Sequence, residues 1–199
     1  MSLPTIQTVR AETTPPNRSV TTSVRGIDHI GLTVPDLEAA TRFFASAFGA
    51  IVLYDALPQS TPGRGGPELE ARLGVPAGTV QVAIRLLGLA DGPSIELFEY
   101  RSPVQAVPAT PSDYGWQHVA FYVDDIEGAA RDVVAAGGIT LGQPRPLPHL
   151  EAGPANRFLY CRTPWGSTLE LISYPDPQPY EQHTGMRRWR PGQPWPWTD

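Results

Sequence analysis

Two histidines and two glutamates occupy matching places in two similar stretches of this chain. The first stretch begins Gly26-Ile-Asp-His29-Ile-Gly-Leu-Thr-Val, and the second begins Gly115-Trp-Gln-His118-Val-Ala-Phe-Tyr-Val. The two stretches end in Ser-Ile-Glu96-Leu-Phe-Glu-Tyr and Thr-Leu-Glu170-Leu-Ile-Ser-Tyr. In a duplicated unit, two imidazoles and two carboxylates at equivalent positions can converge on one metal ion across a pseudo-twofold axis.

The donor types indicate which metals such a site would take. Imidazole and carboxylate together suit a divalent ion such as Zn, Ni, Co, Mn or Fe, and they offer no soft thiolate. A single His or Glu in a strand is usually structural, but a buried carboxylate costs several kcal/mol unless it is paired or metal-bound. As a set, His29, Glu96, His118 and Glu170 therefore predict a metal site.

Strand alternation predicts what surrounds these four side chains, because residues two apart point to the same face. The neighbours expected on the metal-facing sides are mostly apolar and aromatic, which is typical of a small-molecule pocket. Glu99 falls on the opposite face from Glu96 and is expected to be solvated. The predicted substrate-binding residues are Thr33, Phe98, Tyr100, Trp116, Tyr122 and Ile172.

The first copy is predicted to contain four strands and one helix. The helix starts at Asp36, a favourable N-cap, and runs to about Phe48, where Gly49 ends it. A Gly- and Pro-rich excursion covers residues 58–78. The predicted strands are 27–34, 51–57, 80–87 and 94–100.

The second copy repeats this order. A helix capped by Asp124 or Asp125 runs to about Ala136, and a Pro-rich loop covers residues 143–155. The predicted strands are 116–123, 139–142, 158–163 and 168–173. Two copies indicate a duplicated module rather than a solenoid. We therefore predict an α+β protein with a flexible arm at 1–23, βαβββ modules at 24–103 and 112–175, and a Pro- and Trp-rich tail at 176–199.

The bulk composition narrows the class of protein. A chain of 199 residues with 41% hydrophobic residues fits a globular domain, and a net charge of −5 argues against a nucleic-acid partner. No apolar run approaches the ~18 residues that a membrane span needs, and residues 1–23 lack a secretion core. The single Cys161 suits a reducing compartment, so a cytoplasmic protein is predicted. The tail is apolar enough that we expect it to lie along its own or a neighbouring subunit.

These motifs resemble the vicinal oxygen chelate superfamily, which includes glyoxalase I, extradiol dioxygenases and bleomycin-resistance proteins. The resemblance covers about residues 25–175. It implies paired βαβββ modules in a half-open barrel around a metal, and it places His29, Glu96, His118 and Glu170 on the four ligand positions. The motifs that carry it are Asp28-His29-Ile-Gly-Leu-Thr-Val, Gln117-His118-Val-Ala-Phe-Tyr-Val, Ile95-Glu96-Leu-Phe-Glu and Gly166-Ser-Thr-Leu-Glu170-Leu.

The identity of the ligands favours one branch of this superfamily. A His, Glu, His, Glu set is similar to glyoxalase I, whereas the dioxygenases use two histidines and one carboxylate. Resistance proteins that only sequester a drug tend to have lost the ligands. The excursion at 58–78 and the tail depart from the compact glyoxalase I pattern, and they leave the substrate open.

The resemblance implies a metal-dependent lyase or isomerase that chelates a small substrate through two neighbouring oxygens. Glu170 is the expected base, and proton transfer would pass through an enediolate. Two alternatives remain open: an extradiol-type ring-cleaving dioxygenase, and a non-catalytic drug-binding protein. A homodimer is expected, and family members build the site either within one chain or across two.

Overall fold

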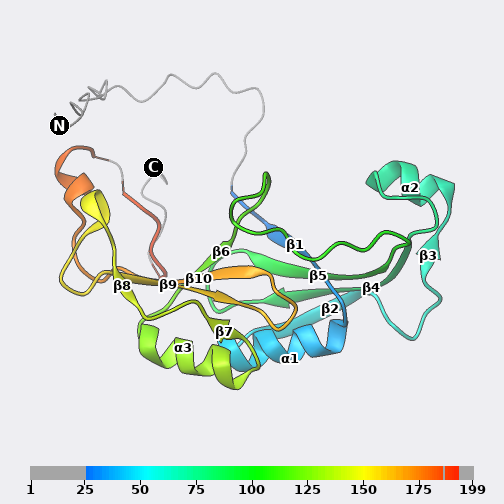
Figure 1. The fold of residues 1–199 in the computed structure, drawn as a ribbon, viewed down its shortest axis with the longest axis horizontal. Helices are drawn as coiled ribbons and strands as arrows, with labels where there is room; N and C mark the ends of the chain where they lie inside the picture. The colour runs from blue at the N-terminus through cyan, green and yellow to red at the C-terminus, as the bar shows by residue number, and fades with distance from the viewer. Residues whose placement is uncertain (1–25, 186, 193–199) are drawn as a thin grey trace.

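The structure is a computed structural model that describes residues 26–185 and 187–192. The arm predicted at 1–23 and the end of the tail, 193–199, lie outside the described residues. The chain forms two five-stranded sheets, each with a helix of its own module against one face (Figure 1). Among the described residues, no helix is both long and apolar enough to cross a membrane.

The first sheet is built from β1, β2, β3, β4 and β5. Its strand order is β1-β5-β4-β2, with β3 paired to β4. β1 runs parallel to β5, and the remaining pairs are antiparallel. The elements of this half are β1 (His29–Val34), α1 (Leu37–Phe48), β2 (Ile51–Leu57), β3 (Arg64–Gly65), α2 (Pro67–Leu73), β4 (Val80–Gly88) and β5 (Ser94–Arg101).

The second sheet repeats this arrangement with the order β6-β10-β9-β7 and β8 paired to β9. β6 again runs parallel to the last strand, β10. The matching topology confirms the α+β class and the two repeated modules. Its elements are β6 (Val119–Tyr122), α3 (Ile126–Ala135), β7 (Ile139–Thr140), β8 (Arg145–Pro146), η1 (His149–Glu151), β9 (Arg157–Arg162), β10 (Thr168–Ser173) and η2 (Pro179–Gln182).

The ends of the two long helices follow from local chemistry. The Asp36 carboxylate accepts a hydrogen bond from the Ala39 N–H at 2.7 Å, and Gly49 ends α1 with φ of 64°. Asp125, rather than Asp124, caps α3. The expectation that Glu99 is solvated was wrong, because its carboxylate accepts a hydrogen bond from the first N–H of α1, that of Leu37, at 2.9 Å.

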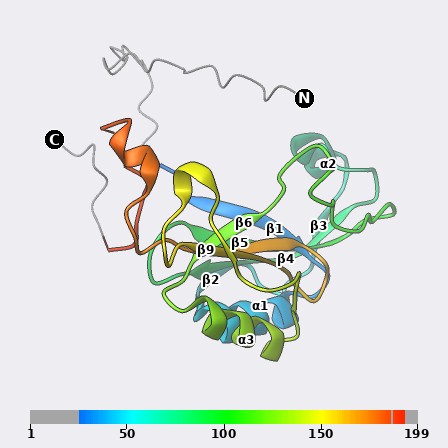
Figure 2. The ribbon, with the colours of Figure 1, turned by 60° about the vertical axis from the view of Figure 1, so that its left-hand side comes forward.

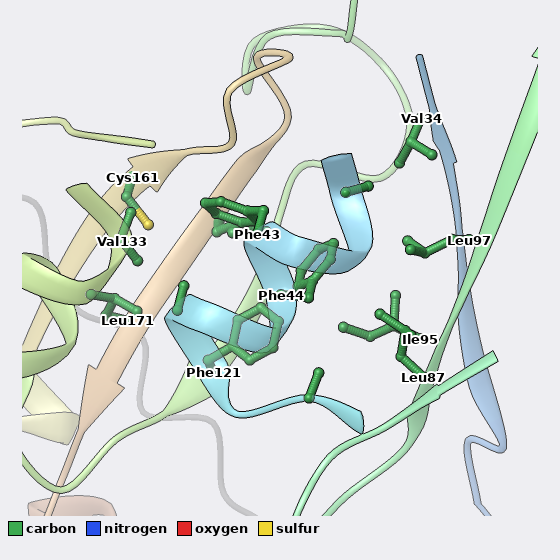
Figure 3. Close-up of a cluster of buried hydrophobic side chains, with 14 of the residues drawn as sticks. Val34, Phe43, Phe44, Leu87, Ile95, Leu97, Phe121, Val133, Cys161 and Leu171 are labelled. Atoms are coloured by element: carbon green, nitrogen blue, oxygen red, sulfur yellow. The ribbon is translucent and has the colours of Figure 1, made fainter. Parts of the chain in front are cut away.

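One apolar core joins the two modules. Helices α1 and α3 lie side by side beneath the sheets in both ribbon views (Figures 1 and 2). Phe44 of α1 lies between apolar residues of the first sheet, such as Leu97, and Phe121 of the second (Figure 3). The ring of Phe48 also stacks on that of Phe121 at 4.1 Å. The helix layer therefore fixes the modules to each other from one side.

The sheets leave their outer strands unpaired within the described part of the chain. β1 and β2 are the outer strands of the first path, and β6 and β7 are those of the second. On β2, the four residues from Ile51 to Tyr54 are between 48% and 63% exposed although all are apolar or aromatic. The two sheets do not close into a barrel within one chain.

The structure departs from the sequence prediction mainly in the connections. The excursion at 58–78 contains β3 and α2, and the loop at 143–155 contains β8 and η1. α2 has seven residues, of which only Leu69 is buried, so it carries too short an apolar repeat to be recognised. β6 begins at Val119 rather than at residue 116, because its partner β10 pairs only from that point.

The described part of the tail lies along its own chain. This is one of the two predicted arrangements, the other being a neighbouring subunit. The Tyr174 hydroxyl donates to the Trp189 carbonyl at 2.5 Å, and the Gly192 N–H donates to the Asp91 carboxylate at 2.5 Å. The first contact anchors the tail to the second module, and the second anchors it to the loop between β4 and β5. The tail therefore spans from one module to the other.

Removing the ring of Phe44 tests the shared core. Phe44 is 1% exposed and its ring contacts three other aromatic rings of the core and Phe43. We expect Phe44→Ala to lower the free energy of unfolding by about 3–5 kcal/mol in urea denaturation, because it leaves a cavity. Val134→Ala is the matched control, because Val134 lies on α3 and is 53% exposed. It should change the free energy of unfolding by less than about 0.5 kcal/mol. Equal effects would contradict this account of the core.

The thiol of Cys161 should be inert in the folded protein. Cys161 is fully buried beneath α3, and burial raises its pKa to about 11. Because the thiolate is the reactive form, we expect no reaction with a disulfide reagent at pH 8 until the protein unfolds, after which one thiol per chain should react. Rapid labelling of the folded protein would show that β9 opens locally.

Candidate metal and proton-transfer site

The first half of the candidate site lies where β1 and β5 run side by side. In their parallel register Gly31 of β1 is the partner of Glu96 of β5. His29 is two residues before Gly31, so its side chain lies on the same face of the sheet as that of Glu96. His29 Nε2 lies 3.2 Å from Glu96 Oε2. The other ring nitrogen, Nδ1, lies 2.8 Å from the Asp28 carboxylate.

The second half repeats this geometry on β6 and β10. His118 directly precedes β6, and its Nε2 lies 3.2 Å from Oε2 of Glu170 on β10. Its Nδ1 lies 2.9 Å from Gln117 Oε1. The Gln117 amide nitrogen donates to the Pro111 carbonyl at 2.8 Å, which fixes the amide with its oxygen toward the histidine.

These partners determine which ring nitrogen carries the proton. Both Asp28 and Gln117 present an oxygen acceptor to Nδ1 at 2.8–2.9 Å, closer than the carboxylate oxygen at Nε2, so Nδ1 is the favoured donor. In a neutral imidazole the Nε2 lone pair then faces the carboxylate oxygen of Glu96 or Glu170. Two acceptors at 3.2 Å repel unless a proton or a metal cation lies between them. Histidines that bind metals are commonly held through their second nitrogen in this way.

The two halves remain separate within one chain. In the described residues, no group of three or more His, Cys, Asp or Glu side chains is arranged to hold a metal ion. The predicted convergence of His29, Glu96, His118 and Glu170 at one point is therefore not found in a single chain. The physical reason is the packing of the modules, which meet through α1 and α3 and do not pair β1 with β6.

The two halves differ in burial and charge. The side chain of Glu170 is 11% exposed and that of Glu96 is 19% exposed. Burial raises the pKa of Glu170, whereas the nearby charges of His118 and Arg188 act in the opposite direction. The hydrogen bond to Asp28, together with attraction by Glu96, raises the pKa of His29. The second half is the more enclosed of the two.

Two of the predicted substrate-binding residues line the first half. Phe98 and Tyr100 follow Glu96 on β5 with their rings stacked at 5.9 Å. The Tyr100 hydroxyl accepts a hydrogen bond from Gln81 at 2.9 Å. Gly31 leaves room for Phe98, because a Cβ there would lie 3.3 Å from the ring. Thr33 follows on the same face of β1 and is exposed.

The other three predicted substrate-binding residues differ in burial. Tyr122 lies on β6 with its ring edge-on to Tyr174 at 4.8 Å, and Ile172 is buried beside both in a second small apolar cluster. Trp116, in contrast, is 99% exposed and precedes the strand. It therefore lines nothing within a single chain, because β6 is shorter than its sequence pattern indicates.

Sequence reasoning missed several groups around the histidines. Asp28 and Gln117 fix the ring nitrogens, and each directly precedes its histidine, so position alone could have indicated them. Tyr160 is the register partner of Glu170 on β9, and its ring lies edge-on to His118 at 5.3 Å. Nothing in the sequence identifies Tyr160, since that contact depends on the pairing of β9 with β10.

Comparison with known proteins places this chain in a family. Residues 26–171 match the profile of the Glyoxalase/Bleomycin resistance protein/Dioxygenase superfamily. A 2-epi-5-epi-valiolone epimerase from an Actinomyces species is 36% identical over 174 residues, which cover 85% of this chain and 90% of the epimerase.

Solved structures share the fold at lower identity. A glyoxalase family protein from Bacillus cereus has a TM-score of 0.61 and 19% identity, covering 78% of this chain and 98% of its own. A glyoxylase/bleomycin resistance protein/dioxygenase domain from Frankia sp. EAN1pec has a TM-score of 0.55 and 21% identity, covering 81% and 100%. The duplicated βαβββ topology, the match over 26–171 and the identity to the epimerase together show that this chain belongs to the glyoxalase/bleomycin resistance protein/dioxygenase superfamily.

Proposed function

We propose that the chain is a metal-dependent epimerase that inverts a stereocentre next to the carbonyl of a small hydroxylated ketone. The 36% identical relative is named as an epimerase, which favours the isomerase class over the lyase class within the sequence-based hypothesis. The first compound to test is the one in that name, 2-epi-5-epi-valiolone. The observation that carries the proposal is that in each half the histidine Nε2 lies 3.2 Å from a glutamate carboxylate oxygen.

A divalent ion fits this donor set only if two halves meet. Each half supplies one imidazole and one carboxylate, and two halves supply the four ligands that suit Zn or a similar ion. We infer that His29 and Glu96 of one copy meet His118 and Glu170 of a second copy. The unpaired outer strands and the exposed apolar residues of β2 support this dimer, because such a surface is usually covered.

The proposed roles follow from the burial of the two carboxyls. The bound ion would act as a Lewis acid toward the substrate carbonyl. Glu170, as the more buried carboxylate, takes the proton from the carbon next to that carbonyl, and the C–H electron pair moves into an enolate. Glu96, which the other copy supplies, passes a proton from solvent to the opposite face of the enolate. The carbon is inverted without net oxidation, and solvent restores both carboxyls to their starting states.

Replacing the proposed base tests this role. We expect Glu170→Gln to lower the rate of epimerisation of 2-epi-5-epi-valiolone by about 10²–10⁴-fold, because general base catalysis contributes that much. Exchange of the substrate C–H with deuterated solvent should fall by the same factor, and metal content should remain largely unchanged. Glu127→Gln is the matched control, since Glu127 lies on α3 and its side chain is 55% exposed.

Three outcomes would overturn the proposal. Unchanged exchange in Glu170→Gln would exclude Glu170 as the base. Consumption of oxygen with a catechol would favour the ring-cleaving alternative. Ligand binding by a protein that neither contains nor takes up metal would favour a non-catalytic binding protein.

Mixing two inactive variants tests whether the site spans two copies. One variant combines His29→Ala with Glu96→Gln, and the other combines His118→Ala with Glu170→Gln. If each site uses one half from each copy, a mixed dimer has one intact site and one doubly damaged site. Random exchange makes about half of the dimers mixed, so the mixture should recover about one quarter of the wild-type activity.

The same mixture excludes the alternative arrangement. A site built within one chain leaves every copy damaged, so mixing would recover nothing. Size-exclusion chromatography and a tagged copy of one variant would establish that the mixed dimers form. Absence of recovery in verified mixed dimers would contradict the two-copy site.

A further inference from the structure

The C-terminal strap, residues 187–192, crosses one end of the second module and is absent from the duplicated plan. Its backbone is held at two places besides Asp91: the Trp189 carbonyl accepts from Tyr174, and the Arg188 N–H donates to the Tyr180 hydroxyl at 2.6 Å. In both ribbon views the orange η2 segment, which leads into the strap, lies beside the yellow η1 segment (Figures 1 and 2). These contacts hold the strap in a defined position against the second module.

Arg188 and Arg190 of the strap both place their guanidinium groups over the Tyr174 ring, and that of Arg188 lies the nearer. The Arg188 guanidinium lies 4.6 Å from the ring centroid, and its Nη1 lies 2.5 Å from Glu151 Oε1. Tyr174 follows Glu170 and Ile172 at two-residue steps, so all three share one face. The charge of Arg188 lowers the pKa of Glu170 and that of Glu151 raises it, so both charges lie within electrostatic reach of the proposed base.

The backbone of Glu151 is also held in place. The Asn156 side chain is fully buried and its amide donates to the Glu151 carbonyl at 3.0 Å. Its amide oxygen accepts from the Asp176 N–H at 2.9 Å. His149, two residues before Glu151, adopts φ of 48°, a conformation that costs energy in a non-glycine residue and persists only where its surroundings fix it.

The Arg188–Glu151 ion pair keeps unused hydrogen-bonding groups on its solvent-exposed side. The side chains of Arg188 and Glu151 are 35% and 42% exposed. In the part of the chain that the structure describes, the guanidinium bonds through Nη1 alone, and Glu151 accepts through Oε1 alone. A guanidinium has five donors and a carboxylate two accepting oxygens, so donors and an acceptor remain free side by side.

We propose that Arg188 and Glu151 together bind hydroxyl groups of the substrate and so set the preference for hydroxylated ketones. A hydroxyl group both donates and accepts, and neighbouring hydroxyls match a donor placed beside an acceptor. The carboxylate disfavours an anionic group such as a phosphate at the same place, because like charges repel. This inference rests on the proposed function for the identity of the site, but hydroxyl binding can be measured without turnover.

Kinetics with two ketones tests the assignment. For 2-epi-5-epi-valiolone, we expect Arg188→Met to raise KM by about 10–100-fold with kcat changed by less than about threefold, because charged hydrogen bonds to substrate are lost. For 2-hydroxycyclohexanone, which lacks the remote hydroxyls, KM should change little. Arg188→Lys keeps the charge but not the planar guanidinium, so its KM should lie between those of wild type and Arg188→Met. Arg131→Met is the matched control, since Arg131 lies on α3 with its side chain 73% exposed.

Binding of myo-inositol, followed by ligand-observed NMR, separates this inference from the proposed function. Wild type should bind the polyol more tightly than Arg188→Met and Glu151→Gln by about 10-fold, whether or not any ketone is turned over. Equal loss of kcat/KM for both ketones would show that the strap only supports the fold. Unchanged inositol binding in both variants, with unchanged thermal unfolding, would also overturn the assignment.

Discussion

The arrangement of each half-site is determined by one constraint: a histidine whose Nδ1 proton is already committed presents its other nitrogen to a carboxylate. Asp28 and Gln117 each supply the acceptor that commits that proton. In a neutral ring the Nε2 lone pair then faces a carboxylate oxygen at 3.2 Å, which is unfavourable unless a proton or a metal cation lies between them. The strands that carry these residues hold the two acceptors together, because the parallel pairing of β1 with β5 and of β6 with β10 fixes their register.

The rest of the fold explains why one chain brings together only two of the four predicted ligands at each place. The aromatic core around Phe44 and Phe121 joins the modules through their helices, and this leaves the site faces of both sheets on the other side. Burying aromatic side chains on this scale stabilises the fold by several kcal/mol. That stabilisation exceeds the cost of leaving two outer strands exposed. A second copy can supply the missing half without disturbing this core. The proposed dimer therefore follows from the same packing that separates the pairs.

Local chemistry made much of the fold predictable, whereas contacts between elements did not. Asp36 and Gly49 determine the ends of α1 by side-chain and backbone effects that involve only their neighbours, and both were predicted. Trp116 was placed on a site face by alternation, but β6 starts only where β10 is available to pair with it. The repeat indicated the four candidate ligands. Their separation into two pairs was not predictable, because it depends on how α1 packs against α3.

Duplication gave two equivalent halves, and the sequence has since made them unequal in ways that suit two different proton-transfer roles. The partner of His29 is the carboxylate of Asp28, whose hydrogen bond raises the pKa of that imidazole, whereas the partner of His118 is the neutral amide of Gln117. Glu170 is the more buried carboxyl, and burial makes it the stronger base once it is ionised. Arg188 lies within electrostatic reach of the Glu170 half, and its charge lowers the pKa of that carboxyl against the effect of burial. An epimerase needs one group to remove a proton and another to return it, and two chemically different carboxyls meet that need better than two equal ones.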